Sequence, residues 1–128
     1  MAKFMDENKQ ILHRLLQPTG WSSLDTAENI HETFRRIKAM GYDEAQTAGC
    51  PIPYEQFGQI AAEEGITIIG THEGWNQVYE APVETVVANH RALGTTNVGI
   101  GAYYFHSEED IYTFCEQANE LGARLKPY

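Results

Sequence analysis

The sequence has few basic residues, and this shortage excludes two classes of partner. Nine lysines and arginines stand against eighteen aspartates and glutamates, which gives a formal net charge of −9 at pH 7. The basic residues are scattered along the sequence, so they do not form a cluster that could follow a phosphate backbone. An anionic membrane surface is excluded for the same reason. We therefore expect neither nucleic acid nor membrane among the partners.

Long hydrophobic runs and paired cysteines are also missing. The apolar stretches extend over only a few residues, as in Gly65–Gly70, and none approaches the length needed to cross a bilayer. The first ten residues lack the apolar core of a secretory signal peptide. The two cysteines, Cys50 and Cys115, lie far apart and outside any CxxC pattern. These features predict a cytoplasmic protein with reduced thiols.

Glycines divide the 128 residues into a repeating pattern. Those at positions 41, 65 and 94 each end a helix-like stretch, a place that suits glycine because it adopts the left-handed conformation without steric cost. A short strand-like run follows each of them. The runs are 42–47, 66–70 and 97–101. Strands that alternate with helices in this way predict parallel βα units.

Four segments have the apolar spacing of amphipathic helices. They begin near Asp25, near Pro53, at Pro82 and after the N-cap Ser107. Their apolar stripes are Ile30, Phe34 and Ile37; Phe57, Ile60 and Ala61; Val83, Val86, Val87 and His90; and Ile111, Phe114, Ala118, Leu121 and Leu125. The last stripe continues past Gly122, so we expect this glycine inside the helix despite a cost of about 1 kcal/mol.

One further segment, Ile11–Gln17, stops at Pro18 and fits either a strand or a short helical turn. Because the βα rhythm calls for a strand before the first helix, we predict a strand here. The expected organisation is a single domain over residues 1–128, built from four βα units.

Particular segments resemble a known family. Phe34–Gln46 places Gly-Tyr-Asp between a helix and a strand, and Gly65–His72 is an apolar strand that ends in a histidine. A helix over Asn89–Gly94 is followed by a strand at Asn97–Ile100. In this order and spacing the segments resemble the xylose-isomerase-like barrel proteins, usually called sugar phosphate isomerases or epimerases. The resemblance extends over residues 11–128.

The resemblance implies a (β/α)₈ barrel, a fold of roughly 250 residues. Since the chain matches the first four units, we expect an α/β half-barrel with an open sheet of four parallel strands. In the family the metal ligands and catalytic carboxylates lie mainly on later strands. We therefore assign no catalytic or metal-binding residue, and expect a divalent metal only if the barrel is completed.

An open parallel sheet predicts self-association, because parallel strands need both faces buried. We expect a homodimer in which two copies close a two-fold barrel. Two alternatives are a flavodoxin-like sandwich, with the helices redistributed over both faces, and a segment of a longer protein that is marginal alone.

Ligands of parallel βα proteins lie at the carboxyl ends of the strands. This rule selects Gln17 and Trp21 after the first strand, Gln46 and Thr47 after the second, His72 and Glu73 after the third, and Tyr104 and His106 after the fourth. His72 is the leading candidate, because an imidazole can hydrogen-bond a sugar hydroxyl or shuttle a proton. The expected substrate contacts are His72, Glu73, Trp21, Gln46, Tyr104 and His106.

Two of the candidates, Glu73 and Trp21, also have an ordinary structural interpretation. Glu73 can serve as a general base or be a solvated loop carboxylate. Trp21 can stack on the apolar face of a sugar or belong to the core. Gln46 can hydrogen-bond a hydroxyl but cannot act as a base.

Two functions of different classes follow. By resemblance, the chain is the N-terminal part of a sugar or sugar-phosphate isomerase or epimerase and contributes substrate contacts. The alternative is a non-catalytic, self-associating binding or assembly module. Metal-dependent turnover of ketoses would separate the two. A third hypothesis, relationship to the DNA-repair endonucleases of the same barrel superfamily, is disfavoured by the charge of −9.

Overall fold

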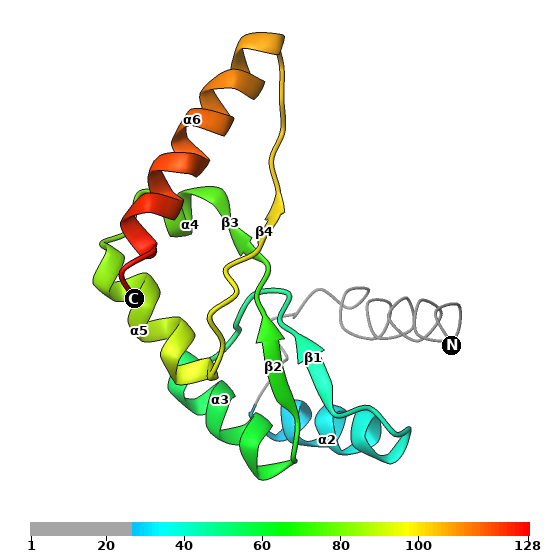
Figure 1. Cartoon of the computed structure of the whole chain (residues 1–128). Helices are drawn as coiled ribbons and strands as arrows, with labels where there is room; N and C mark the ends of the chain where they lie inside the picture. Colours follow the sequence, from blue (N-terminus) through cyan, green and yellow to red (C-terminus); the bar gives the residue numbers. More distant parts are fainter. Residues whose placement is uncertain (1–26) are drawn as a thin grey trace.

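The computed structural model describes residues 27–128, which form five helices and four short strands (Figure 1). In chain order these are α2 (Ala27–Ala39), β1 (Glu44–Gln46), α3 (Tyr54–Glu63), β2 (Thr67–Gly70), β3 (Glu73–Gly74), α4 (Trp75–Tyr79), α5 (Val83–Leu93), β4 (Ile100–Ala102) and α6 (Glu108–Leu125). The strand expected over 11–17 and the candidates Gln17 and Trp21 lie outside the described residues.

The expected half-barrel of four βα units is wrong. The described strands form two separate two-stranded parallel sheets, β1–β2 and β3–β4, instead of one sheet of four strands. The helices do not alternate with the strands either: β3 follows β2 directly, and two helices, α4 and α5, come between β3 and β4.

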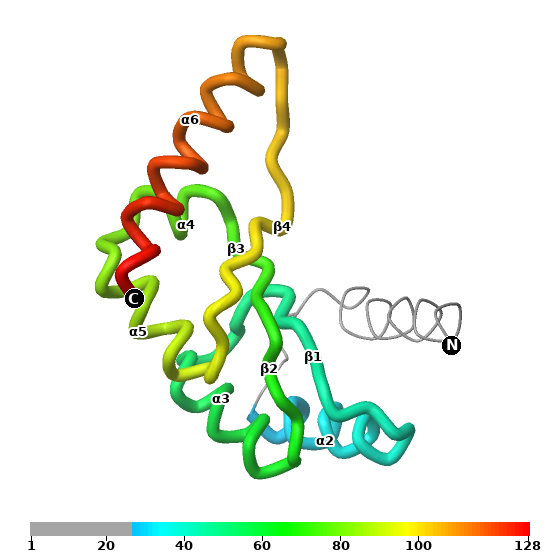
Figure 2. The backbone as a smooth tube through the Cα atoms, in the orientation of Figure 1, coloured from blue at the N-terminus to red at the C-terminus, as the bar shows by residue number. Residues whose placement is uncertain are grey.

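The physical reason is that β2 and β3 belong to one extended segment, 67–74, which has different neighbours along its length. Figure 2 shows β2 continuing into β3, with β1 beside the first part and β4 beside the second. The His72 amide donates to the Thr47 carbonyl over 2.9 Å, whereas the Glu73 amide donates to the Gly99 carbonyl over 2.8 Å. The segment 67–74 therefore pairs with β1 along its first part and with β4 along its second part. Each of the two sheets consequently has two strands.

The main core lies between α2, α3 and the β1–β2 sheet. Its buried residues are Ile30, Phe34, Ile37, Ala45, Phe57, Ile60, Ala61, Ile66, Ile68 and Leu93. The rings of Phe34 and Phe57 meet edge to face, with centroids 5.5 Å apart. All the residues expected on the inner stripes of the first two helices are buried, which confirms both predictions.

A glycine sets the distance between α3 and α5. A Cβ atom at Gly58 would lie 2.1 Å from the carbonyl oxygen of Ala92, far inside van der Waals contact. The two helices can therefore pack this closely only because position 58 has no side chain.

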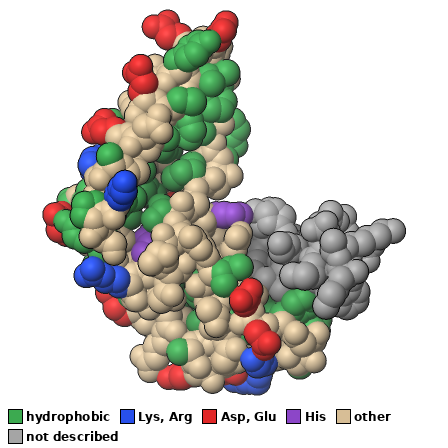
Figure 3. All heavy atoms as spheres, in the orientation of Figure 1, with side chains coloured by type: hydrophobic (Ala, Val, Ile, Leu, Met, Phe, Trp, Pro, Cys, Tyr) green, Lys and Arg blue, Asp and Glu red, His purple; other side chains and the backbone are tan. Residues whose placement is uncertain are grey.

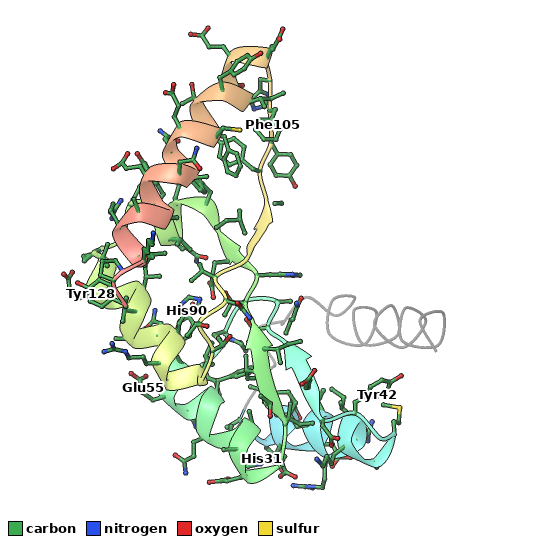
Figure 4. The ribbon with its side chains drawn as sticks, in the orientation of Figure 1. His31, Tyr42, Glu55, His90, Phe105 and Tyr128 are labelled. Carbon is green, nitrogen blue, oxygen red and sulfur yellow. The ribbon has the colours of Figure 1, made fainter. Side chains whose placement is uncertain are left out.

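His90 joins α5 to the strands through both ring nitrogens (Figure 4). Nδ1 lies 2.8 Å from the carbonyl oxygen of Val86, which can only accept, so Nδ1 carries the proton. Nε2 therefore accepts from the Thr71 hydroxyl, 3.0 Å away. The Thr71 oxygen in turn accepts from the Gly99 amide over 3.4 Å. His90 is thus a structural residue, as its place on the apolar stripe predicts.

The start of α6 is fixed by the expected cap at Ser107. Its Oγ accepts from the Asp110 amide over 3.2 Å, and the Asp110 carboxylate accepts from the amides of His106 and Ser107. These hydrogen bonds lower the pKa of Asp110, because they favour its charged form. Gly122 lies inside the helix, as predicted.

The apolar stripe expected on α6 is mostly not buried. Leu121 is its one buried member, and together with the partly buried Leu125 it packs against Val78 and Val86. The first turns of α6 project away from the rest of the described chain, beside the segment 103–107 (Figure 1). None of the helices within residues 27–128 combines the length and apolarity needed to cross a membrane.

The hydrogen bond between Thr71 and His90 yields a stability prediction. Thr71→Val keeps the side-chain shape but leaves the buried His90 Nε2 without a donor, so it should lower the free energy of unfolding by about 1–3 kcal/mol. Urea denaturation followed by circular dichroism measures this. Thr67→Val, the same change at an exposed strand position, is the control. If the two substitutions lowered the free energy of unfolding equally, this would contradict the assigned hydrogen bond between Thr71 and His90.

Candidate functional site

The predicted site residues divide between two faces of the strand ends. Successive side chains of an extended segment point to opposite sides. Along 71–73, Thr71 and Glu73 face the helices: Thr71 bonds His90 of α5, and Glu73 accepts from the hydroxyl of Tyr54 on α3 over 3.0 Å. His72, between them, lies on the other side. We call these the helix-covered face and the open face, where the open face is the one that no helix between residues 27 and 128 covers.

The same division holds on β1. Ala45 and Thr47 are buried, with Ala45 in the core between α2 and α3, whereas Gln46 is exposed. Gln46 therefore lies on the open face with His72. The two segments are neighbours, because the His72 amide donates to the Thr47 carbonyl. The structure thus brings Gln46 and His72 to one face at the carboxyl ends of adjacent parallel segments.

Glycines lie beside both of these side chains. The Nε2 atom of Gln46 is 3.8 Å from the position that a Cβ atom would take on Gly70. The Cδ2 and Cβ atoms of His72 are each 3.4 Å from the corresponding positions on Gly99 and Gly101. At Gly99 the missing side chain allows the two segments to approach each other, because a Cβ atom there would lie 2.1 Å from the carbonyl oxygen of Thr71.

The helix-covered face holds a second polar group, the Glu73 cluster, which consists of Thr47, Cys50, Tyr54 and Glu73. Glu73 is only 5% exposed and Thr47 only 1%. Within residues 27–128, two of the buried side-chain oxygens, Thr47 Oγ1 and Glu73 Oε1, lack a hydrogen-bond partner. Tyr54, which sequence reasoning missed, anchors the start of α3 to this carboxylate. Nothing in the sequence indicates that pair, because its members lie 19 residues apart.

The groups around Glu73 stay protonated at neutral pH. Burial, and then the negative charge of Glu73, raise the pKa of Cys50 to about 12. The same two causes, with the hydrogen bond to Glu73, raise the pKa of Tyr54. A neutral thiol and a neutral phenol surround the carboxylate, so Cys50 is not an activated nucleophile.

The two remaining candidates lie on the segment that leads into α6. Tyr104 is 81% exposed. His106 is also exposed, and its backbone amide donates to the carboxylate that caps α6. Both follow β4 on the segment that projects with the first turns of α6 (Figure 1), so they do not join Gln46 and His72.

The described residues do not fit a metal centre. Between residues 27 and 128, the histidine, cysteine, aspartate and glutamate side chains form no group of three or more that could hold an ion. The divalent metal that the family resemblance implies for a completed barrel therefore finds no set of ligands among these residues.

Comparisons with protein-family models, with curated proteins and with solved structures find no match to this chain.

The raised pKa of Cys50 yields a reactivity prediction. The chain has two cysteines, and Cys115 is exposed. At pH 8 Cys50 should react with iodoacetamide on the order of a thousandfold more slowly than Cys115, because it holds so little thiolate. Mass spectrometry of the native protein, labelled in dilute solution so that single chains react, should show one modified thiol, and two after denaturation. Equal labelling of both in the native protein would contradict the burial of Cys50.

Proposed function

We propose that the chain binds a neutral sugar at the open face of the strand ends and so contributes substrate contacts to sugar isomerisation or epimerisation. The observation that carries the proposal is the shared placement of Gln46 and His72 on that face. A primary amide and a neutral imidazole each donate and accept hydrogen bonds. A sugar hydroxyl does both as well, so these two side chains match a polyhydroxylated ligand.

A neutral sugar fits this face better than a sugar phosphate. Gln46 carries no charge, and the chain as a whole carries −9, which repels a phosphate. The strand-end carboxylate, Glu73, lies on the helix-covered face and interacts with Tyr54. We therefore assign sugar binding to Gln46 and His72. Glu73 instead has a structural role, because it holds the end of its strand against α3 through Tyr54.

We also infer a cytoplasmic location. Cys50 and Cys115 are both free thiols, and reduced cysteines are the rule in that compartment.

The proposal is tested by titrating the protein with neutral aldoses and ketoses while following backbone amide shifts by NMR. We expect shifts centred on the ends of β1 and β2, and weaker binding in His72→Ala and Gln46→Ala. Loss of one hydrogen bond of this kind costs about 0.5–1.5 kcal/mol, which is up to about tenfold in affinity.

Two controls separate this site from its neighbours. His106→Ala makes the same change at an exposed histidine on the segment that leads into α6, and Glu73→Gln changes the helix-covered face without changing size. Both should bind sugar as the unmodified chain does. Absence of binding to any neutral sugar would overturn the proposal. If Glu73→Gln weakened sugar binding more than His72→Ala did, the binding site would lie on the helix-covered face instead.

A further inference from the structure

The projecting part of the chain, residues 103–120, leaves large apolar side chains in solvent. Phe105 and Ile111 are each 44% exposed. On its inner side the rings of Trp75, Tyr103 and Phe114 pack against one another in tilted and edge-to-face arrangements, with centroids 4.5–5.6 Å apart. Figure 3 shows hydrophobic side chains grouped along this arm, and Figure 4 labels Phe105 on it. Apolar surface left exposed in this way is typical of a protein contact.

One face of α6, which we call the outer face, changes in chemical character from one end of the helix to the other. Six residues share about a quarter of the helix circumference at 3.6 residues per turn. They are Glu108, Ile111, Cys115, Ala118, Gly122 and Lys126. All except the half-buried Ala118 are exposed, and Lys126 retains helical backbone angles. The outer face thus runs from an acidic end, through an apolar middle, to a basic end.

The middle of the outer face has a large residue near one end and open space near the other. Ile111 projects at the acidic end. At the basic end, a Cβ atom built on Gly122 would meet nothing within 4 Å. The first turn also carries the acidic Glu109 and Asp110. In the last turn Lys126 is the base on this face, because Arg124 donates to the carbonyl oxygens of Tyr79 and Ala81 instead.

We propose that the outer face of α6 binds the same face of a second copy of this chain, with the two helices antiparallel. Turning the helix end for end brings opposite properties together. Ile111 faces Gly122 of the partner subunit, Cys115 faces Ala118 of the partner subunit, and Glu108 faces Lys126 of the partner subunit. Each large residue meets a small one, and each acid meets a base.

A second copy is favoured over an unrelated partner because the face is its own complement. A two-fold interface requires one patch that fits itself, so each contact occurs twice. An acidic end opposite a basic end meets this requirement in the antiparallel arrangement alone, since parallel helices would bring like charges together. The proposal is independent of sugar binding, which uses the ends of β1 and β2.

The first test is the mass in solution, measured by sedimentation velocity over a micromolar range of concentrations. The unmodified chain should form a dimer. Gly122→Leu should remain folded, because the new side chain enters open space and replaces a helical glycine. It should nevertheless be monomeric, because leucine occupies the space that Ile111 of the partner subunit needs. Thr113→Leu, at an exposed position on the opposite side of α6, should dimerise normally.

A charge exchange tests the direction of the helices. Glu108→Lys alone and Lys126→Glu alone should each raise the dissociation constant about tenfold, because each change acts twice in a two-fold dimer. The double variant should recover the original affinity. Glu116→Lys, at an exposed position off the outer face, is the matched control. Since Glu108→Lys also reduces the net charge, weaker association cannot come from general repulsion.

Three results would overturn the proposal. One is a chain that stays monomeric at every concentration. Another is a Gly122→Leu variant that dimerises as well as the unmodified chain. The third is a double charge variant that binds no better than the single ones. Thermal melting of each variant by circular dichroism confirms that it remains folded.

Discussion

An extended backbone must place successive side chains on opposite sides, and the described structure is organised by this constraint on the segment 67–74. Thr71 and Glu73 face the helices, where they hold His90 of α5 and Tyr54 of α3. His72, between them, is left to the other side. The segment 67–74 therefore positions two helices on one side. On its other side it carries His72, the side chain that we propose binds a ligand.

The local features were predictable from the sequence because they depend on near neighbours. The cap at Ser107, the glycine after α5 and the buried stripe of Ile30, Phe34 and Ile37 all follow from residues a few positions apart. The sheet topology was not predictable in this way. Short strands give no periodic signal, and a strand of two residues such as Glu73–Gly74 cannot be distinguished from a loop in the sequence. The half-barrel prediction lacks this strand and is therefore wrong.

Part of the candidate site could likewise be predicted. The rule that ligands lie at strand ends selects Gln46, His72 and Glu73, which lie at or just after the ends of β1 and β2. It could not tell which face each side chain takes, because that depends on the register of the strands and on which side α3 and α5 pack. The pairing shifts between Ala45 and Gln46, and a shift of one residue exchanges the two faces.

The projecting part of the chain, residues 103–120, also affects how stability is distributed along the chain. The rings of Tyr103 and Phe114 contact each other and Trp75 of α4, and the cap at Ser107 joins residues close together in the sequence. These residues lie outside the core around Phe34 and Phe57. The core around Phe34 and Phe57 instead joins helices across a strand. The first turns of α6 can therefore open while that core stays closed, as a separate cooperative unit. Their backbone amides would exchange with solvent through local opening, and those of α2 and α3 only through global unfolding.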